Sequence, residues 1–250
     1  NQYPINVMEG FVTKSRTIIV IKQGNENNFT IKKNQYAIPQ HVIHITGKSL
    51  LDLLEIIEKR TPQILKIIQD GEIKAHQLLL NDSLFDVKTI QNRFGLTLKI
   101  PKNYFYALKN DNFVWLLNEC PSGSSSLLIT ELPLNIIKPQ DNILEKVIKI
   151  HDSIGSLYIR GKEPASNQYI DKSYPLYLSR ITIDGKSAYE TKGTWRLKDS
   201  FMFGAFVNYL IVDPKNSRII YLEGFCYIPS RKQRDYMHAL ESIIKSVKIN

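Results

Sequence analysis

Apolar and polar residues alternate along four consecutive stretches in the C-terminal third of the chain. These stretches cover residues 174–183, 187–195, 201–212 and 218–228. Alternation with a period of two predicts β-strands that bury one face. Asp184-Gly185 favours a tight hairpin between the first two strands, and Asp213-Pro214 suits a type I turn between the last two. The pattern therefore predicts an antiparallel meander of four strands.

The first eighty residues follow a different pattern, in which short β-branched stretches give way to helical spacing. The β-branched stretches cover residues 16–22, 28–33 and 41–46. They predict a small sheet. Ser49 and Asp52 then resemble a helix-capping pair, and leucine and isoleucine recur at helical spacing towards Leu80. Thr61-Pro62 predicts a kink or a restart of this helix, because proline has no amide hydrogen to donate.

The segments between these regions predict further helices and strands. They are a helix over 84–94, strands over 96–100, 113–117 and 127–132, a helix capped by Asp141, and a final helix over 234–247. Pro121 to Ser126 lacks the glycine spacing and the lysine of a phosphate-binding loop, so we expect a surface turn there. Residues 159–173 are polar and predict the longest irregular connection, a kind of segment in which binding often occurs.

The predicted fold class is α+β, in two parts. Residues 1–82 form a small sheet with long helices, and residues 83–250 form a larger antiparallel sheet flanked by helices. The boundary is expected near Asn81-Asp82. The first residues resemble neither a signal peptide nor a methionine start, so we expect the chain to begin inside a longer gene product. No stretch approaches the roughly 20 apolar residues of a membrane-spanning helix.

Net charge and cysteine content narrow the function classes. The formal charge is +9, but the basic residues are spread along the chain, so we interpret them as compositional and expect no nucleic-acid partner. Cys120 and Cys226 lie far apart, without further cysteines or histidines at metal-ligand spacing, which argues against zinc and against a disulfide framework. We predict no cofactor and no metal.

The sequence contains no established catalytic motif, so any catalytic role would depend on single acidic or basic side chains. His41 and His44 would lie on opposite faces of a strand, and His151 is interpreted as a surface or satisfied helix residue. Glu190 and Glu223 each lie within an apolar strand, where a carboxylate can have a raised pKa and act as an acid or base. The competing interpretation is that they pair with Arg180, Arg196 or Arg218, or face water.

Two basic clusters are candidates for binding. Arg231, Lys232 and Arg234 precede the final helix, and Arg160, Lys162 and Lys172 lie in the long connection. If the two clusters meet, they would suit phospholipid headgroups or an acidic partner, whereas the plainer interpretation is a solvated helix entry. Trp195 and the phenylalanines of the meander are mostly explained by core packing, although a few at one end could line an apolar groove.

Five blocks of sequence carry a family resemblance. They are NQYAIPQ at 34–40, NFVWL at 112–116, AYETKGTW at 188–195, FMFGAFVNY at 201–209 and SRIIYLEGFCYIPSRKQRDYMHALE at 217–241. Their order and spacing resemble the Bacteroidota envelope lipoprotein family known as domain of unknown function 4837. Tyr36 and Ala205 depart from the family pattern, which has Trp and Pro at these two positions. The Thr61-Pro62 pair also departs from the family pattern, because it lies inside what is usually a continuous helix.

The resemblance implies a location and not an activity. It suggests a lipid-anchored protein of the cell envelope, with an N-terminal anchor outside this chain and no catalytic residues to carry over. The order of elements from 84 to 249 also resembles the PsbP-like α/β sandwich, at the level of topology. We therefore predict a non-catalytic envelope binding or scaffolding protein, whose partner is an envelope protein or an anionic lipid surface. The alternative is a hydrolase-like enzyme that uses Glu190 or Glu223 in a cleft between the two parts.

Overall fold

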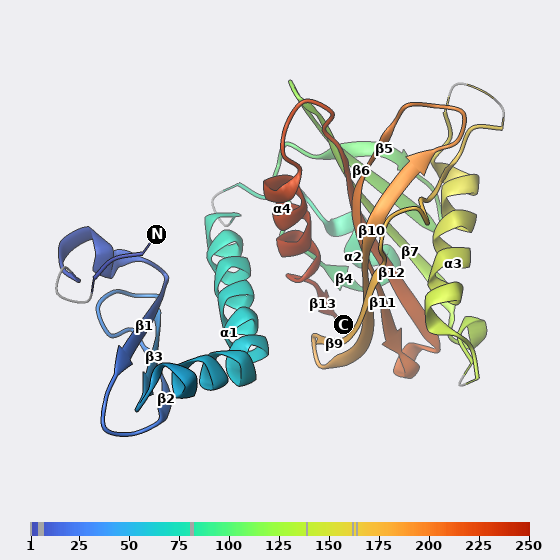
Figure 1. Ribbon diagram of the computed structural model, residues 1–250. Coiled ribbons are helices and arrows are strands. Elements are labelled where there is room, and N and C mark those ends of the chain that lie inside the picture. Colours follow the sequence, from blue (N-terminus) through green and yellow to red (C-terminus); the bar gives the residue numbers. More distant parts are fainter. Residues whose placement is uncertain (1, 5–7, 81–82, 139, 162, 164) are drawn as a thin grey trace. The chain divides into compact units, whose positions relative to one another are not determined.

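A computed structural model describes all residues except 1, 5–7, 81–82, 139, 162 and 164 (Figure 1). The chain divides into two compact units, residues 1–78 and residues 79–250. The predicted boundary at Asn81-Asp82 falls outside the described residues. None of the described helices combines the length and the apolar character that crossing a bilayer requires.

The smaller unit packs one helix on a three-stranded sheet. Its elements are the 3₁₀ turn η2 (Gly10–Lys14), the strands β1 (Thr17–Gln23), β2 (Asn28–Lys33) and β3 (His41–Gly47), and the helix α1 (Leu50–Leu79). The strand order is β1-β3-β2, with β1 parallel and β2 antiparallel to β3. Ile43 and Ile45 of β3 are buried against Leu53 and Ile64 of α1, which form the core of this unit. The predicted small sheet and long helix are confirmed.

Helix α1 is continuous through Pro62, and Figure 1 shows that it bends. Proline removes one hydrogen bond of the helix ladder and pushes on the preceding turn. The Thr61 hydroxyl also donates to the Ile57 carbonyl at 2.7 Å, a contact that is often found in bent helices. The predicted kink is therefore confirmed, whereas a restart of the helix is not observed.

The larger unit is an eight-stranded sheet covered by helices. Its elements are α2 (Lys88–Phe94), β4 (Leu96–Thr97), β5 (Phe105–Lys109), β6 (Phe113–Cys120), β7 (Gly123–Pro133), η4 (Leu134–Ile136), α3 (Ile143–Tyr158), β8 (Gln168–Ile170), β9 (Tyr177–Ile183), β10 (Lys186–Leu197), β11 (Phe203–Asp213), η5 (Pro214–Asn216), β12 (Arg218–Tyr227), α4 (Arg234–Ile244) and β13 (Lys248–Ile249). The large sheet has the order β5-β6-β7-β12-β11-β10-β8, and β9 also pairs with β10. The strands β9 to β12 form the predicted antiparallel meander, and the α+β class is confirmed.

Alternate residues of the meander belong to two different hydrophobic cores, one on each face of the sheet. Tyr209 and Leu222 belong to the core that includes α2 and α4, whereas Leu210 and Tyr221 belong to the core that includes α3. Figure 1 shows α3 and α4 on opposite faces of the sheet. Helix α3 lies close to β8 at Gly155, where any added Cβ would overlap the Gln168 carbonyl oxygen. The sheet is therefore buried on both faces, and its two faces have separate surroundings.

Three local predictions were wrong at the ends of elements. Strand β7 begins at Gly123, so Ser125 and Ser126 are buried in the sheet, and only the first residues of the predicted serine-rich surface turn form a turn. The predicted irregular connection 159–173 contains β8, which pairs with the end of β10. The N-cap of α3 is Asn142, whose Oδ1 accepts from the Leu144 amide at 3.1 Å, and not Asp141. The hydrophobic pattern carries little information at such positions, because serine and asparagine occur both in turns and in strands or caps.

Candidate functional site

Glu223 lies in the core beneath α3, with only 1% of the residue exposed. The Tyr221 hydroxyl donates to its Oε2, and its Oε1 lies 3.5 Å from Nε2 of His151. Within the described residues, none of the predicted arginine partners lies within ion-pair distance of Glu223. Arg196 pairs with Asp171, Arg218 pairs with Asp213 and Glu131, and Arg180 donates to the Ser187 hydroxyl. The interpretation that Glu223 pairs with an arginine or faces water was therefore wrong, and its charged partner is a histidine from another element.

His151 carries the positive charge of this pair. Burial lowers the pKa of the imidazole, but the carboxylates of Glu223 and Asp152 outweigh it and raise the pKa to about 9. Nδ1 of His151 lies 3.2 Å from Oδ1 of Asp152, which also accepts from the Ile170 amide of β8 at 2.8 Å. The imidazolium therefore joins α3 to β12 on one side, and Asp152 joins α3 to β8 on the other.

Two further polar side chains lie fully buried on the same face of the sheet. Asn208 and Thr191 are 0% exposed, and their side-chain nitrogen and oxygen atoms have no hydrogen-bond partner within the described residues. We call His151, Thr191, Asn208, Tyr221 and Glu223 the polar core cluster. A substrate would reach these groups only if α3 moved away from the sheet, so the arrangement is that of a buried ion pair and not of an open catalytic site.

Glu190 lies on the other face of the sheet, beneath α4. It accepts a hydrogen bond from the Tyr209 hydroxyl at 2.7 Å and lies 3.3 Å from Nζ of Lys245 and 3.5 Å from Nζ of Lys192. Glu241 joins the same two lysines, and these four charges balance one another. Burial together with Glu241 and Glu190 raises the pKa of Tyr209 well above its ordinary value. Glu190 and Glu223 therefore face opposite sides of one sheet and do not form a carboxylate pair.

The predicted basic residues lie at one end of the large sheet, where three connections meet. The Lys198 amide donates to the Asn167 carbonyl at 3.0 Å, which joins the connection after α3 to the β10–β11 turn. The Ala205 amide donates to Oε1 of Gln233 at 2.8 Å, which joins the start of β11 to the entry of α4. Figure 1 shows these connections at the upper end of the larger unit. Arg160 follows α3 and Arg231 precedes α4, so the two basic clusters share this end but flank opposite faces of the sheet.

This end exposes an aromatic side chain that was predicted to begin a strand of the meander. Phe201 lies in the β10–β11 turn and is 99% exposed, and Phe203 is 49% exposed. We call Arg160, Lys198, Phe201, Phe203, Arg231, Lys232 and Arg234 the basic–aromatic end. The five basic side chains of this end are exposed. In the described part of the chain, none of them lies within ion-pair distance of a carboxylate. The same segments also contain the acidic residues Glu163, Asp199 and Asp235. Lys162 lies outside the described residues.

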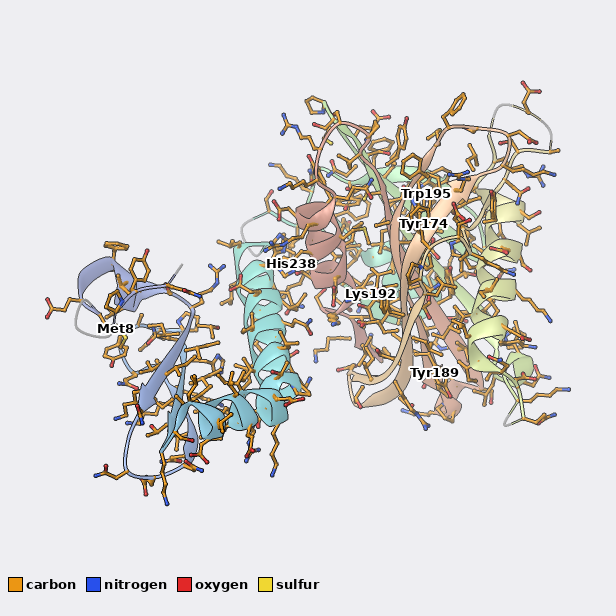
Figure 2. All side chains as sticks on the ribbon, in the orientation of Figure 1. Met8, Tyr174, Tyr189, Lys192, Trp195 and His238 are labelled. Atoms are coloured by element: carbon orange, nitrogen blue, oxygen red, sulfur yellow. The ribbon has the colours of Figure 1, made fainter. Side chains whose placement is uncertain are left out.

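Trp195 is not part of this surface. It is 2% exposed, and its indole Nε1 donates to the Cys226 carbonyl at 3.2 Å (Figure 2). The exposure of Phe201 was not predicted, because the residue begins a hydrophobic stretch. The one available signal was its position directly after Lys198-Asp199-Ser200, a polar run typical of turns, in which Asp199 adopts a positive φ of 55°.

Among the described residues, no three His, Cys, Asp or Glu side chains gather as they would around a metal ion.

Two family models match the chain, one for each part. The model described as Domain of unknown function (DUF4837) matches residues 83–246. A second model, Domain of unknown function (DUF8532), matches residues 1–81. The resemblance inferred at residues 34–40 therefore falls within the second family and not the first.

No curated protein matches the chain. Among solved structures, one similar chain is a point mutant of the protein Mog1, with 12% identity and a TM-score of 0.38 over 62% of this chain and 90% of that chain. Another is the Saccharomyces cerevisiae Ran-binding protein Mog1p, with the same identity and TM-score over 62% of this chain and 89% of that chain. At this TM-score the similarity carries no argument about function.

Proposed function

We propose that this chain, which belongs to the DUF4837 family of unknown function, is a non-catalytic binding protein of the cell envelope that docks on an anionic membrane surface. The docking surface is the basic–aromatic end. The observation that carries the proposal is that Phe201, 99% exposed, shares this end with the basic residues Arg231, Lys232 and Arg234. The envelope location is itself part of the proposal, since it comes from the resemblance.

A fully exposed phenylalanine on a turn suits the interface of a bilayer. Aromatic rings are favoured at the level of the headgroups, where the ring leaves water without entering the hydrocarbon core. Phe201 lies between β10 and β11, so insertion of its ring would disturb neither strand. Phe203, at the start of β11, would follow it into the interface.

The three cations at the entry of α4 supply the electrostatic part. A basic residue close to an anionic bilayer contributes roughly 1 kcal/mol, and burial of a phenylalanine contributes roughly 2 kcal/mol. Three cations and one ring thus give about 5 kcal/mol, which corresponds to binding of roughly millimolar strength. Such a surface would orient a protein that a lipid anchor already holds, because stable attachment takes two signals.

The test is flotation of the full chain with vesicles of phosphatidylcholine alone and of phosphatidylcholine mixed with phosphatidylglycerol. The test variant changes Arg231, Lys232 and Arg234 to Ala. The matched control changes Lys88, Lys149 and Lys215 to Ala, which removes the same charge from exposed sites elsewhere in the larger unit. A third variant is Phe201→Ser.

We expect the chain to float with the anionic vesicles only, and less as salt rises, because the charges are screened. The Arg231, Lys232 and Arg234 variant and the Phe201 variant should both lose flotation, whereas the control should retain it. Equal loss in the control would mean that overall charge drives binding. No flotation of the unaltered chain, together with retention of acidic polypeptides on a column of the protein, would replace the membrane with an acidic partner.

A further inference from the structure

A pocket of about 360 Å³ opens on the α3 face of the larger unit, at the end of the sheet opposite the basic–aromatic end. It lies between the segment that follows β7, the start of α3 and the strands β9 to β12. Its lining residues are Leu134, Ile137, Lys138, Ile143, Arg180, Ser187, Tyr189, Val212 and Ile219. Figure 2 shows Tyr189 near the lower end of the sheet, away from Trp195. A volume of this size lies at the small end of the range for small-molecule sites.

The lining divides into an apolar part and a basic part. Five aliphatic side chains, from η4, α3, β11, β12 and the connection between η4 and α3, form the apolar part. Arg180, Ser187 and Tyr189 lie together on the neighbouring strands β9 and β10, with Arg180 directly opposite Tyr189 in the pairing. No carboxylate lines the pocket among the described residues. Its composition therefore suits a ligand that has both an apolar body and a negative group.

Arg180 differs from the other arginines of the meander. Arg196 and Arg218 each lie within ion-pair distance of a carboxylate. Arg180 has no such partner in the described ranges, and its Nε donates to the Ser187 hydroxyl at 3.4 Å, while its guanidinium carbon lies 5.9 Å from the Tyr189 ring. The long hydrogen bond and the ring contact hold the guanidinium at the pocket and leave most of its donors available.

Lys138 is a weaker candidate than Arg180 for pairing with the negative group of a ligand. Asp141 accepts from the Lys138 backbone amide at 2.8 Å and lies 3.6 Å from Nζ of Lys146, so a carboxylate already lies beside this lysine. A guanidinium also presents paired donors in a planar fork that matches the two oxygens of a carboxylate, whereas an ammonium group acts as a point charge.

We propose that this pocket binds a small amphiphilic monocarboxylate, with its hydrocarbon chain against the aliphatic residues and its carboxylate paired with Arg180. The Ser187 hydroxyl is a second donor for the same group, because it lies on the neighbouring strand beside Arg180. The strands β10, β11 and β12 each have the pocket at one end and the basic–aromatic end at the other. Membrane docking and carboxylate binding are therefore separable functions, and each can fail without the other.

The experiment is calorimetric titration of the full chain with octanoate, compared with octan-1-ol and with acetate. Octanoate should bind saturably. Octan-1-ol, which keeps the chain but lacks the charge, should bind about tenfold more weakly, the order of effect expected for one charge-assisted hydrogen bond. Acetate, which keeps the charge but lacks the chain, should show no saturation. The proposal is overturned if octanoate does not saturate or if octan-1-ol binds equally well.

Two variants and one control locate the binding. Arg180→Gln should weaken octanoate binding about tenfold and leave octan-1-ol binding unchanged. Ile137→Trp should fill the pocket and abolish binding of both ligands. Arg60→Gln is the matched control, because Arg60 is another exposed arginine that lies over an aromatic ring and lacks a carboxylate partner among the described residues. Unchanged octanoate affinity in the Arg180 variant, or an equal loss in the Arg60 variant, would refute the assignment.

Discussion

The ion pair of the polar core cluster should make the stability of the larger unit depend on pH. His151 has a pKa of about 9 in the folded chain, against an ordinary value of 6.5. Because the folded state binds this proton more tightly, its contribution is fully present below pH 6.5 and is lost as the pH rises through about 9. A difference of 2.5 pKa units, from 9 minus 6.5, corresponds to about 3 kcal/mol of unfolding free energy at most.

Tryptophan fluorescence during urea unfolding is a suitable assay. Both tryptophans of the chain, Trp115 and Trp195, lie in the larger unit, so the signal does not include the smaller one. The free energy of unfolding should stay nearly level below pH 6.5 and fall by up to about 3 kcal/mol towards pH 9. The Glu223→Gln variant should be less stable at neutral pH and should show a clearly smaller fall, because the larger of the two carboxylate contributions that raise the pKa of His151 is gone and only Asp152 remains.

His238 lies in the same unit, and the His238→Gln variant is the control, which should keep the fall of the unaltered chain. Equal pH dependence in the unaltered chain and in Glu223→Gln would refute the reasoning. A rise in the free energy of unfolding of the unaltered chain between pH 6.5 and 9 would also refute the reasoning.

Other predictions concern packing and thiol reactivity. Gly155→Ala should destabilise the larger unit by about 1–3 kcal/mol in the same urea assay, because the added methyl group overlaps the Gln168 carbonyl oxygen. Gly71→Ala should instead protect the amides of α1 from hydrogen exchange and stabilise it by about 1 kcal/mol, because the nearest atom to an added Cβ is 3.9 Å away. If both substitutions stabilised the chain, or both destabilised it, the packing account would be contradicted. Burial raises the pKa of the Cys226 thiol to about 12, so a thiol reagent at neutral pH should modify at most Cys120 in the folded chain and both cysteines in denaturant.

The meander could be predicted because its information is local. Period-two alternation and the turn residues at Asp184-Gly185 and Asp213-Pro214 lie within each hairpin, so no distant contact is needed to identify them. The pairing of β12 with β7 was not predicted, because it joins strands that are far apart in the sequence. The same pairing explains the buried Ser125 and Ser126, which are polar residues that the hydrophobic pattern assigned to a turn.

The polar core cluster shows a second limit of the sequence. Period-two alternation in 218–228 puts Glu223 on the same face of the strand as Tyr221 and Phe225, which both belong to the core beneath α3. The residue that neutralises Glu223, His151, comes from α3 itself. Such a contact depends on how a helix crosses a sheet, and no spacing along the chain encodes that crossing. Basic residues at 231–234 were visible in the sequence, whereas the contact between the start of β11 and the entry of α4 depends on the pairing of β11 with β12.

Fluorescence quenching by brominated lipids tests membrane docking most directly. The variant Phe201→Trp places an indole ring at the exposed turn, and Tyr177→Trp is the control, since Tyr177 is 66% exposed on β9 away from this turn. We predict that vesicles of anionic lipid with brominated chains quench the Phe201→Trp variant more strongly than the unaltered chain, and that the Tyr177→Trp variant shows no added quenching. Binding to the vesicles without added quenching in the Phe201→Trp variant, or stronger quenching in the Tyr177→Trp variant, would contradict docking through the basic–aromatic end.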